Sequence, residues 1–138
     1  MTDGSNKLNL LEDLLAKAKA KGADTADAVY IESQSLAVAQ RLGNPEKLER
    51  SESADIGLRA LVGKRQAIVS SSDSSPEALE ELVERVIAMA KAVPEDPYCG
   101  IADPDQLATE IHDIDSFDPS EPSAETLVDW ANRAEEAA

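Results

Sequence analysis

The sequence predicts an α+β fold: an antiparallel meander of about four strands flanked by two long helices, then an extended connector and a truncated third helix. Apolar residues first recur with the 3.6-residue period of a helix, then with the two-residue period of strands, and then with the helical period again. We therefore expect an N-terminal α+β domain over 1–93 and a connector over 94–122. Residues 123–138 are interpreted as the start of a helix that leads to a further, C-terminal domain.

The first helix is expected to begin at Asn9, a residue type favoured at helix N-caps, with Glu12 three positions later in a capping-box-like pattern. Gly22 is expected to end it, because glycine readily adopts the left-handed conformation that often follows a helix. Its apolar face comprises four residues with helical spacing: Leu11, Leu14, Leu15 and Ala18.

The strands follow from the change of period and from turn chemistry. Residues 26–42 have a two-residue period, and Gly43-Asn44-Pro45 after them is typical of a turn. The polar stretch 46–53 is interpreted as an exposed or edge strand, and 56–62 as the next strand. Gly63-Lys64 then turns the chain into a last strand, which completes the antiparallel meander.

Ser75 is expected to cap the second long helix, and Pro76 to occupy its first position, where an N–H group is not needed. Pro94 ends this helix. Neither long helix is apolar all round, so each is expected to cover one face of the sheet. The residues predicted to be buried between sheet and helices are Leu14, Leu58, Ala60, Val69, Leu82, Val83 and Val86.

The connector is rich in proline and acid: five of the seven prolines lie within 94–122. We expect it to be poorly packed, apart from a short helix near 106–111, because it has little apolar surface to offset the entropy of ordering. Ser123 is expected to cap a third helix, which reaches Ala138 without a glycine, asparagine or proline stop. We therefore expect the chain to be a fragment of a longer protein.

The formal net charge of −15 lies entirely in the second half of the chain. Residues 1–72 contain ten acidic and ten basic residues, whereas 73–138 contain eighteen acidic and three basic ones. Such a surface repels phosphate backbones, so we expect no nucleic-acid partner. No apolar run approaches the roughly 20 residues of a membrane span, and there is no secretory signal. The single cysteine, Cys99, fits a reducing compartment, and we expect a cytoplasmic protein.

Two residues are the first candidates for chemistry. His112 is the only histidine, and no His-Glu-x-x-His spacing occurs, whereas a zinc site needs three or four ligands. A structural or surface role is therefore favoured over a ligand role for His112. Cys99 as a nucleophile would need a nearby base and an oxyanion hole, so it is interpreted as a small apolar residue.

Three further groups have ordinary structural interpretations. Asp103, Asp105 and the acids of 113–118 lack the glycine-turn spacing of a calcium loop, which favours solvated acids over a hard-cation site. The serines of 70–75 have no Gly-x-Ser-x-Gly elbow and are interpreted as turn and cap residues. The remaining group is a basic patch without aromatics to stack bases, interpreted as charges that keep a strand edge in solution: Arg59, Lys64 and Arg65. We thus predict no catalytic, cofactor-binding or metal residue in this chain.

Eight segments form an ordered set over nearly the whole chain. In the first half they are Lys19-Ala20-Lys21-Gly22-Ala23-Asp24, Ala26-Asp27-Ala28-Val29-Tyr30, Glu49-Arg50-Ser51-Glu52 and Ile56-Gly57-Leu58-Arg59-Ala60-Leu61-Val62-Gly63. In the second half they are Ser70-Ser71-Ser72-Asp73-Ser74-Ser75-Pro76-Glu77-Ala78-Leu79, Pro94-Glu95-Asp96-Pro97-Tyr98-Cys99-Gly100-Ile101-Ala102-Asp103, Ser116-Phe117-Asp118-Pro119 and Ala131-Asn132-Arg133-Ala134-Glu135. The set resembles the N-terminal domain of the TldD/PmbA family, once called modulators of DNA gyrase and regarded as metallopeptidases. The last three segments resemble PmbA, also called TldE, more than TldD.

The resemblance implies a role without chemistry for this chain. In the family, TldD carries a His-Glu-x-x-x-Asp metal motif in its C-terminal domain and PmbA lacks it, and the pair acts on small or unfolded peptides. None of that motif lies within 1–138, so zinc is expected only in a TldD-like partner subunit. The implied function is a non-catalytic N-terminal scaffold of a PmbA/TldE-like subunit, with a TldD-like subunit or a second copy of itself as partner.

One alternative of a different class remains open. The chain could be a free-standing adaptor with no peptidase link, whose exposed sheet edge takes up an extended peptide as an added strand. The residues that follow Ala138 in the full reading frame would distinguish the two.

Overall fold

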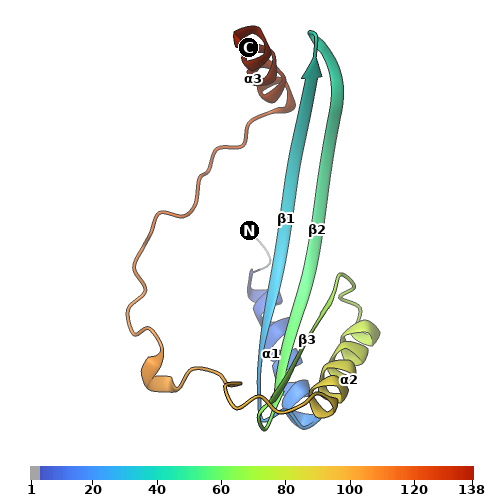
Figure 1. The fold of residues 1–138 in the computed structure, drawn as a ribbon, viewed down its shortest axis with the longest axis vertical. Helices are drawn as coiled ribbons and strands as arrows, with labels where there is room; N and C mark the ends of the chain where they lie inside the picture. Colours follow the sequence, from blue (N-terminus) through green and yellow to red (C-terminus); the bar gives the residue numbers. More distant parts are fainter. Residues whose placement is uncertain (1–3) are drawn as a thin grey trace. The chain divides into compact units, whose positions relative to one another are not determined.

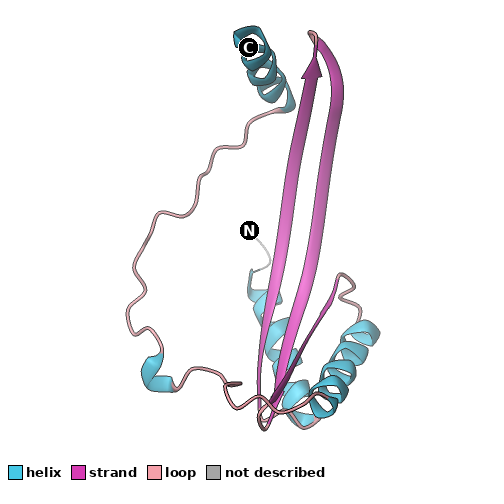
Figure 2. Ribbon diagram, in the orientation of Figure 1, coloured by secondary structure: helices cyan, strands magenta, loops and turns pink. Residues whose placement is uncertain are grey.

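The computed structural model describes residues 4–138 and confirms the α+β class (Figures 1 and 2). The elements, in chain order, are α1 (Gly4–Ala20), β1 (Thr25–Arg41), β2 (Asn44–Val62), β3 (Arg65–Ser71), α2 (Pro76–Ala92), a single 3₁₀ turn η1 (Pro104–Gln106) and α3 (Ala124–Ala137). They form two compact units, one of residues 4–32 with 54–107 and one of 33–53 with 108–138. The predicted domain boundary at residue 93 stays a prediction.

The sheet has three strands in the order β1-β2-β3, whereas the sequence suggested about four. The difference lies in β2, where the polar stretch 46–53 and the apolar stretch 56–62 are one continuous strand. No glycine or proline separates the two stretches, so the extended backbone continues although its side chains change character. β3 pairs antiparallel with the second stretch only, from Ile56 opposite Ser71 to Val62 opposite Arg65.

α1 begins at Gly4 and not at Asn9, so Asn9 lies within the helix and does not cap it. Its end is where it was expected. Gly22 has a φ of 108°, its N–H donates to the Lys19 carbonyl at 3.0 Å, and the Ala23 N–H donates to the Ala18 carbonyl at 3.0 Å. These two bonds are those of a Schellman motif, with glycine in the left-handed position.

Both helices cover the same face of the sheet in the first unit, and not one face each. The core consists of alternate residues of β2 and β3 together with the apolar stripes of α1 and α2. All seven residues predicted to be buried are buried: Leu14, Leu58, Ala60, Val69, Leu82, Val83 and Val86. Lys21, after the end of α1, adds an ion pair at 2.9 Å to each of Glu80 and Glu84 of α2.

Ser75 caps α2 as the sequence predicts. Its Oγ accepts a hydrogen bond from the Ala78 N–H at 3.4 Å, and Pro76 is the first helical residue. A side-chain oxygen at this position satisfies one of the amides that a helix leaves unpaired at its start. Ser123 does the same for α3, since its Oγ accepts from the Thr126 N–H at 3.2 Å.

We expect Ser75→Ala to lower the free energy of unfolding by about 1 kcal/mol, because the Ala78 amide loses its acceptor. Urea denaturation followed by circular dichroism measures this. The matched control is Ser74→Ala, because Ser74 is exposed and lies next to the cap. Equal midpoints for the two variants would show that the cap contributes nothing to stability.

Candidate functional site

The structure places Cys99 and His112, the two first candidates for chemistry, in different units. Cys99, in the first unit, is a free thiol and is buried. His112, in the second unit, is exposed, and its Nδ1 lies 3.8 Å from the Glu110 carboxylate. Over residues 4–138, no group of three or more histidine, cysteine or acidic side chains is placed to hold a metal ion.

The serine-rich segment before α2 is a turn and a cap. The Asp73 carboxylate accepts a hydrogen bond from the Ser75 N–H at 2.8 Å, and the Ser71 Oγ accepts one from the Asp73 N–H at 3.0 Å. The hydrogen bonds from Ser75 hold the pKa of Asp73 below its ordinary value. These bonds order the entry into the helix, and they give Ser71 and Ser75 the roles of turn and cap residues.

Each member of the predicted basic patch has a partner near the β2–β3 turn. Arg59 forms a two-point ion pair with Asp27 of β1, with Nε at 2.9 Å from Oδ2, and this contact raises the pKa of the guanidinium. Arg65 lies 3.2 Å from the Glu95 carboxylate. Lys64 donates to the Cys99 carbonyl at 3.3 Å. Two of the three basic side chains are thus paired with carboxylates, and the third with a backbone carbonyl.

The start of the predicted connector is packed, contrary to the expectation for 94–122 as a whole. The Asp96 N–H donates to the Lys64 carbonyl at 2.7 Å, and the Cys99 N–H donates back to the Asp96 carbonyl at 3.0 Å. Cys99 is only 4% exposed. From Gly100 to Ser123 every residue is exposed, and the expected helix near 106–111 is limited to the single turn η1.

Part of the sheet face opposite the helices is exposed in the first unit, although Leu61 of the same face is only 3% exposed. Arg59 stands on it, because its neighbours Leu58 and Ala60 point into the core. Ile68 is the partner of Arg59 on β3 and is 65% exposed. Gly57 is on the same face, where a Cβ would approach the Val29 side chain to 3.0 Å. The face therefore carries apolar side chains around one ion pair and is a candidate contact surface.

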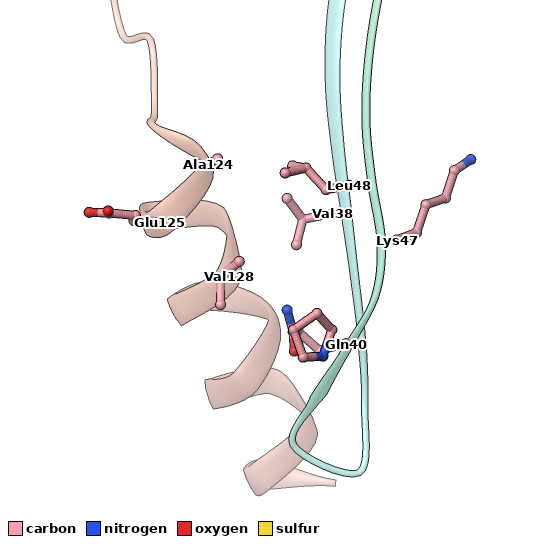
Figure 3. Close-up of a pocket in the computed structure, with 8 residues that line it drawn as sticks. Val38, Gln40, Lys47, Leu48, Ala124, Glu125 and Val128 are labelled. Atoms are coloured by element: carbon pink, nitrogen blue, oxygen red, sulfur yellow. The ribbon is translucent and has the colours of Figure 1, made fainter.

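The second unit contains a pocket that the sequence did not predict. It lies between α3 and the end of the β1–β2 hairpin and has a volume of about 360 Å³ (Figure 3). Its walls are mostly apolar: Val38, Gln40, Pro45, Lys47, Leu48, Ala124, Glu125 and Val128. The apolar stripe of α3 is visible in the sequence, but nothing in the sequence says that it packs on a hairpin about eighty residues earlier.

α3 also binds the hairpin turn through one side chain. Leu42 and Gly43 both have positive φ, of 51° and 69°, as in a type I′ turn. The Glu135 carboxylate accepts a hydrogen bond from each of their N–H groups, at 2.5 and 2.9 Å. A carboxylate with two amide donors is a charge-assisted contact, stronger than a neutral hydrogen bond.

The chain is similar in sequence to one protein family and to two of its members. The family model described as PmbA/TldA metallopeptidase domain 1 matches residues 26–90. Metalloprotease PmbA of Escherichia coli O157:H7 is 32% identical over 124 residues, which are 90% of this chain and 27% of that protein. The Metalloprotease PmbA homolog of Haemophilus influenzae is 27% identical over 118 residues, 86% of this chain and 26% of that protein. The chain thus spans about a quarter of the length of these relatives.

Two solved structures share the fold. A modulator of DNA gyrase from Bacteroides thetaiotaomicron aligns with a TM-score of 0.73 at 18% identity, over 82% of this chain and 25% of the other. TldE from Thermococcus kodakarensis aligns with a TM-score of 0.67 at 19% identity, over 93% of this chain and 29% of the other. The resemblance to the TldD/PmbA family is confirmed. The chain belongs to the PmbA/TldD family and carries its first domain.

Proposed function

We propose that this chain is the non-catalytic N-terminal scaffold of a PmbA/TldE-like subunit, within a TldD/PmbA-type metallopeptidase complex that acts on small or unfolded peptides. The observation that carries the proposal is the similarity to PmbA over 90% of the chain. The proposal that the chain is non-catalytic concerns this part of the protein, in which residues 4–138 place no three metal-binding side chains together. We propose that the catalytic zinc belongs to a TldD-like partner subunit.

A scaffold role is also consistent with the exposed part of the sheet face in the first unit. The open face around Gly57 and Ile68 offers apolar side chains for contact with another domain or subunit. In the described part of the chain, no helix is both long and apolar enough to cross a bilayer. We propose that the complex works in the cytoplasm, and that the chain continues after Ala138 into a C-terminal domain.

We expect the purified chain to retain no stoichiometric zinc after dialysis and to show no turnover of an unfolded peptide. The physical reason is that His112 and Cys99 cannot supply three ligands and an open coordination position. The acidic second half will attract divalent cations weakly, and this attraction will fade with added salt. Elemental analysis and a peptide cleavage assay make the measurement.

The control is His112→Ala, which should leave residual metal unchanged. Stoichiometric zinc that survives dialysis and disappears in His112→Ala would overturn the scaffold proposal. The proposed partner is tested in a separate experiment with the full-length protein. The full-length protein should show peptidase activity only when a TldD-like subunit is added. An adaptor with no peptidase link would remain inactive after that addition.

A further inference from the structure

The pocket of the second unit is an apolar space that is open to solvent. α3 contributes Ala124 and Val128 to its walls, and the β1–β2 hairpin contributes Val38 and Leu48 (Figure 3). Leu48 is 67% exposed although its side chain points into this space. The volume of about 360 Å³ is at the lower end of the range of about 300–1,000 Å³ that small-ligand sites have. The pocket therefore suits a short apolar group better than a long hydrocarbon chain.

One polar group in the pocket wall lacks a partner. Gln40 lines the pocket, and its Nε2 atom is buried without a hydrogen-bond acceptor among the residues that the structure describes. In Figure 3 the amide of Gln40 lies between the hairpin and Val128. A buried donor without an acceptor costs free energy, which a ligand oxygen would recover. The ligand that fits combines an apolar group with a carbonyl oxygen, and a peptide offers both in each apolar residue.

The charges of the second unit favour a cationic ligand. Residues 33–53 and 108–138 together contain twelve acidic and four basic residues, for a net charge of −8. All four basic residues are in ion pairs within the unit: Arg41 with Glu46, Lys47 with Glu49, Arg50 with Glu52 and Arg133 with Asp129. Glu125, at the edge of the pocket, is exposed and has no ion pair in the described part of the chain. This field repels an anionic amphiphile such as a fatty acid and attracts a peptide that carries lysine or arginine.

We propose that this pocket binds a peptide segment in which an apolar residue is flanked by lysine or arginine. The apolar side chain occupies the space between α3 and the hairpin, and the peptide carbonyl accepts a hydrogen bond from Gln40. The flanking cations lie in the field of Glu125 and the other acids of α3. The site goes beyond the proposed scaffold function, which needs no peptide pocket and would stand without it.

The test titrates the 138-residue chain with the probe acetyl-Gly-Lys-Leu-Lys-Gly-amide and follows methyl groups by proton–carbon NMR. The methyl signals of Val38, Leu48 and Val128 should shift and saturate, whereas those of Leu82 in the core of the first unit should not move. A probe with alanine in place of leucine should bind at least about tenfold more weakly, because it loses most of the apolar contact.

Two further probes test the rest of the ligand. A probe with glutamate in place of both lysines should bind severalfold more weakly, and added salt should narrow this difference because it screens the charges. Isoamylamine has the same apolar group and a cation but no carbonyl oxygen. It should bind more weakly than the leucine probe, because Gln40 then remains without an acceptor.

Two pairs of variants locate the site. Ala124→Leu should abolish saturable binding, because the added side chain fills the pocket. Its matched control is Ala134→Leu, which adds the same side chain to an exposed position of α3 outside this pocket and should not change the affinity. Circular dichroism verifies that both leucine variants keep the helix. Glu125→Gln should weaken binding severalfold, whereas Glu136→Gln removes the same charge from an exposed residue outside the pocket and should have a smaller effect.

Several results would overturn the proposal. No saturable shift of the three methyl groups would mean that the pocket takes no peptide. Equal binding of the leucine and alanine probes, or unchanged binding by Ala124→Leu, would mean attraction to the acidic surface alone. Equal binding of isoamylamine would mean a site for cationic amphiphiles and not for peptides. Shifts on dilution of the chain without any probe would mean that a second copy fills the pocket. Binding by the 138-residue chain but not by the full-length protein would mean that other residues of the protein cover it.

Discussion

Leu82→Ala should lower the free energy of unfolding by about 2–5 kcal/mol, the largest effect we expect from a single substitution. Leu82 is 2% exposed and lies in the core that α1, α2, β2 and β3 share. Removing its side chain loses buried apolar surface and leaves a cavity that packed neighbours fill only in part. Chemical denaturation of the 138-residue chain gives the value directly.

Leu8→Ala is the matched control, because Leu8 is also a helical leucine but is 62% exposed. It should change stability by less than about 0.5 kcal/mol. If the two variants unfolded at the same denaturant concentration, the side of α2 that faces the sheet would be misassigned.

Gly63→Val should destabilise the chain by about 1–3 kcal/mol through its backbone. Gly63 has a φ of 60° in the two-residue turn between β2 and β3, and a β-branched residue is strained in that region. Its N–H also donates to the Asp24 carboxylate at 2.6 Å, so the turn cannot relax without losing this bond. Thermal unfolding should show a lower midpoint.

Gly63→Ala separates backbone strain from side-chain bulk. Positive φ at Gly63 but not at Lys64 is the pattern of a type II′ turn, whose first position favours glycine, so alanine should also lower the midpoint. An alanine variant as stable as the unsubstituted chain would mean that the turn does not require positive φ.

The sequence predicted the first unit well because its signals are local. The start of α2 at Ser75 and Pro76 and the end of α1 at Gly22 depend on groups only a few residues away in the chain. The period of the apolar residues identifies the faces of the elements that form the core. The predicted strand count and the predicted start of α1 were wrong because each was inferred from local residue types alone. Polar residues in 46–53 do not end a strand, and Asn9 is tolerated inside a helix that other residues stabilise.

The second unit could not be predicted because its contacts are not local. Glu135 and Leu42 are far apart in sequence, and neither belongs to a motif that names the other. The same is true of Val128 and Val38 around the pocket. A single sequence shows which faces are apolar, but not which of them meet.

The unequal lengths of β2 and β3 have a consequence for hydrogen exchange. β3 shields β2 only from Ile56 to Val62, within the unit that holds the core. Between 44 and 53, β2 pairs with β1 alone, and every side chain there is exposed. Amides of 56–62 should therefore exchange with deuterium only when the whole core opens, whereas those of 44–53 should exchange through local fraying, orders of magnitude sooner.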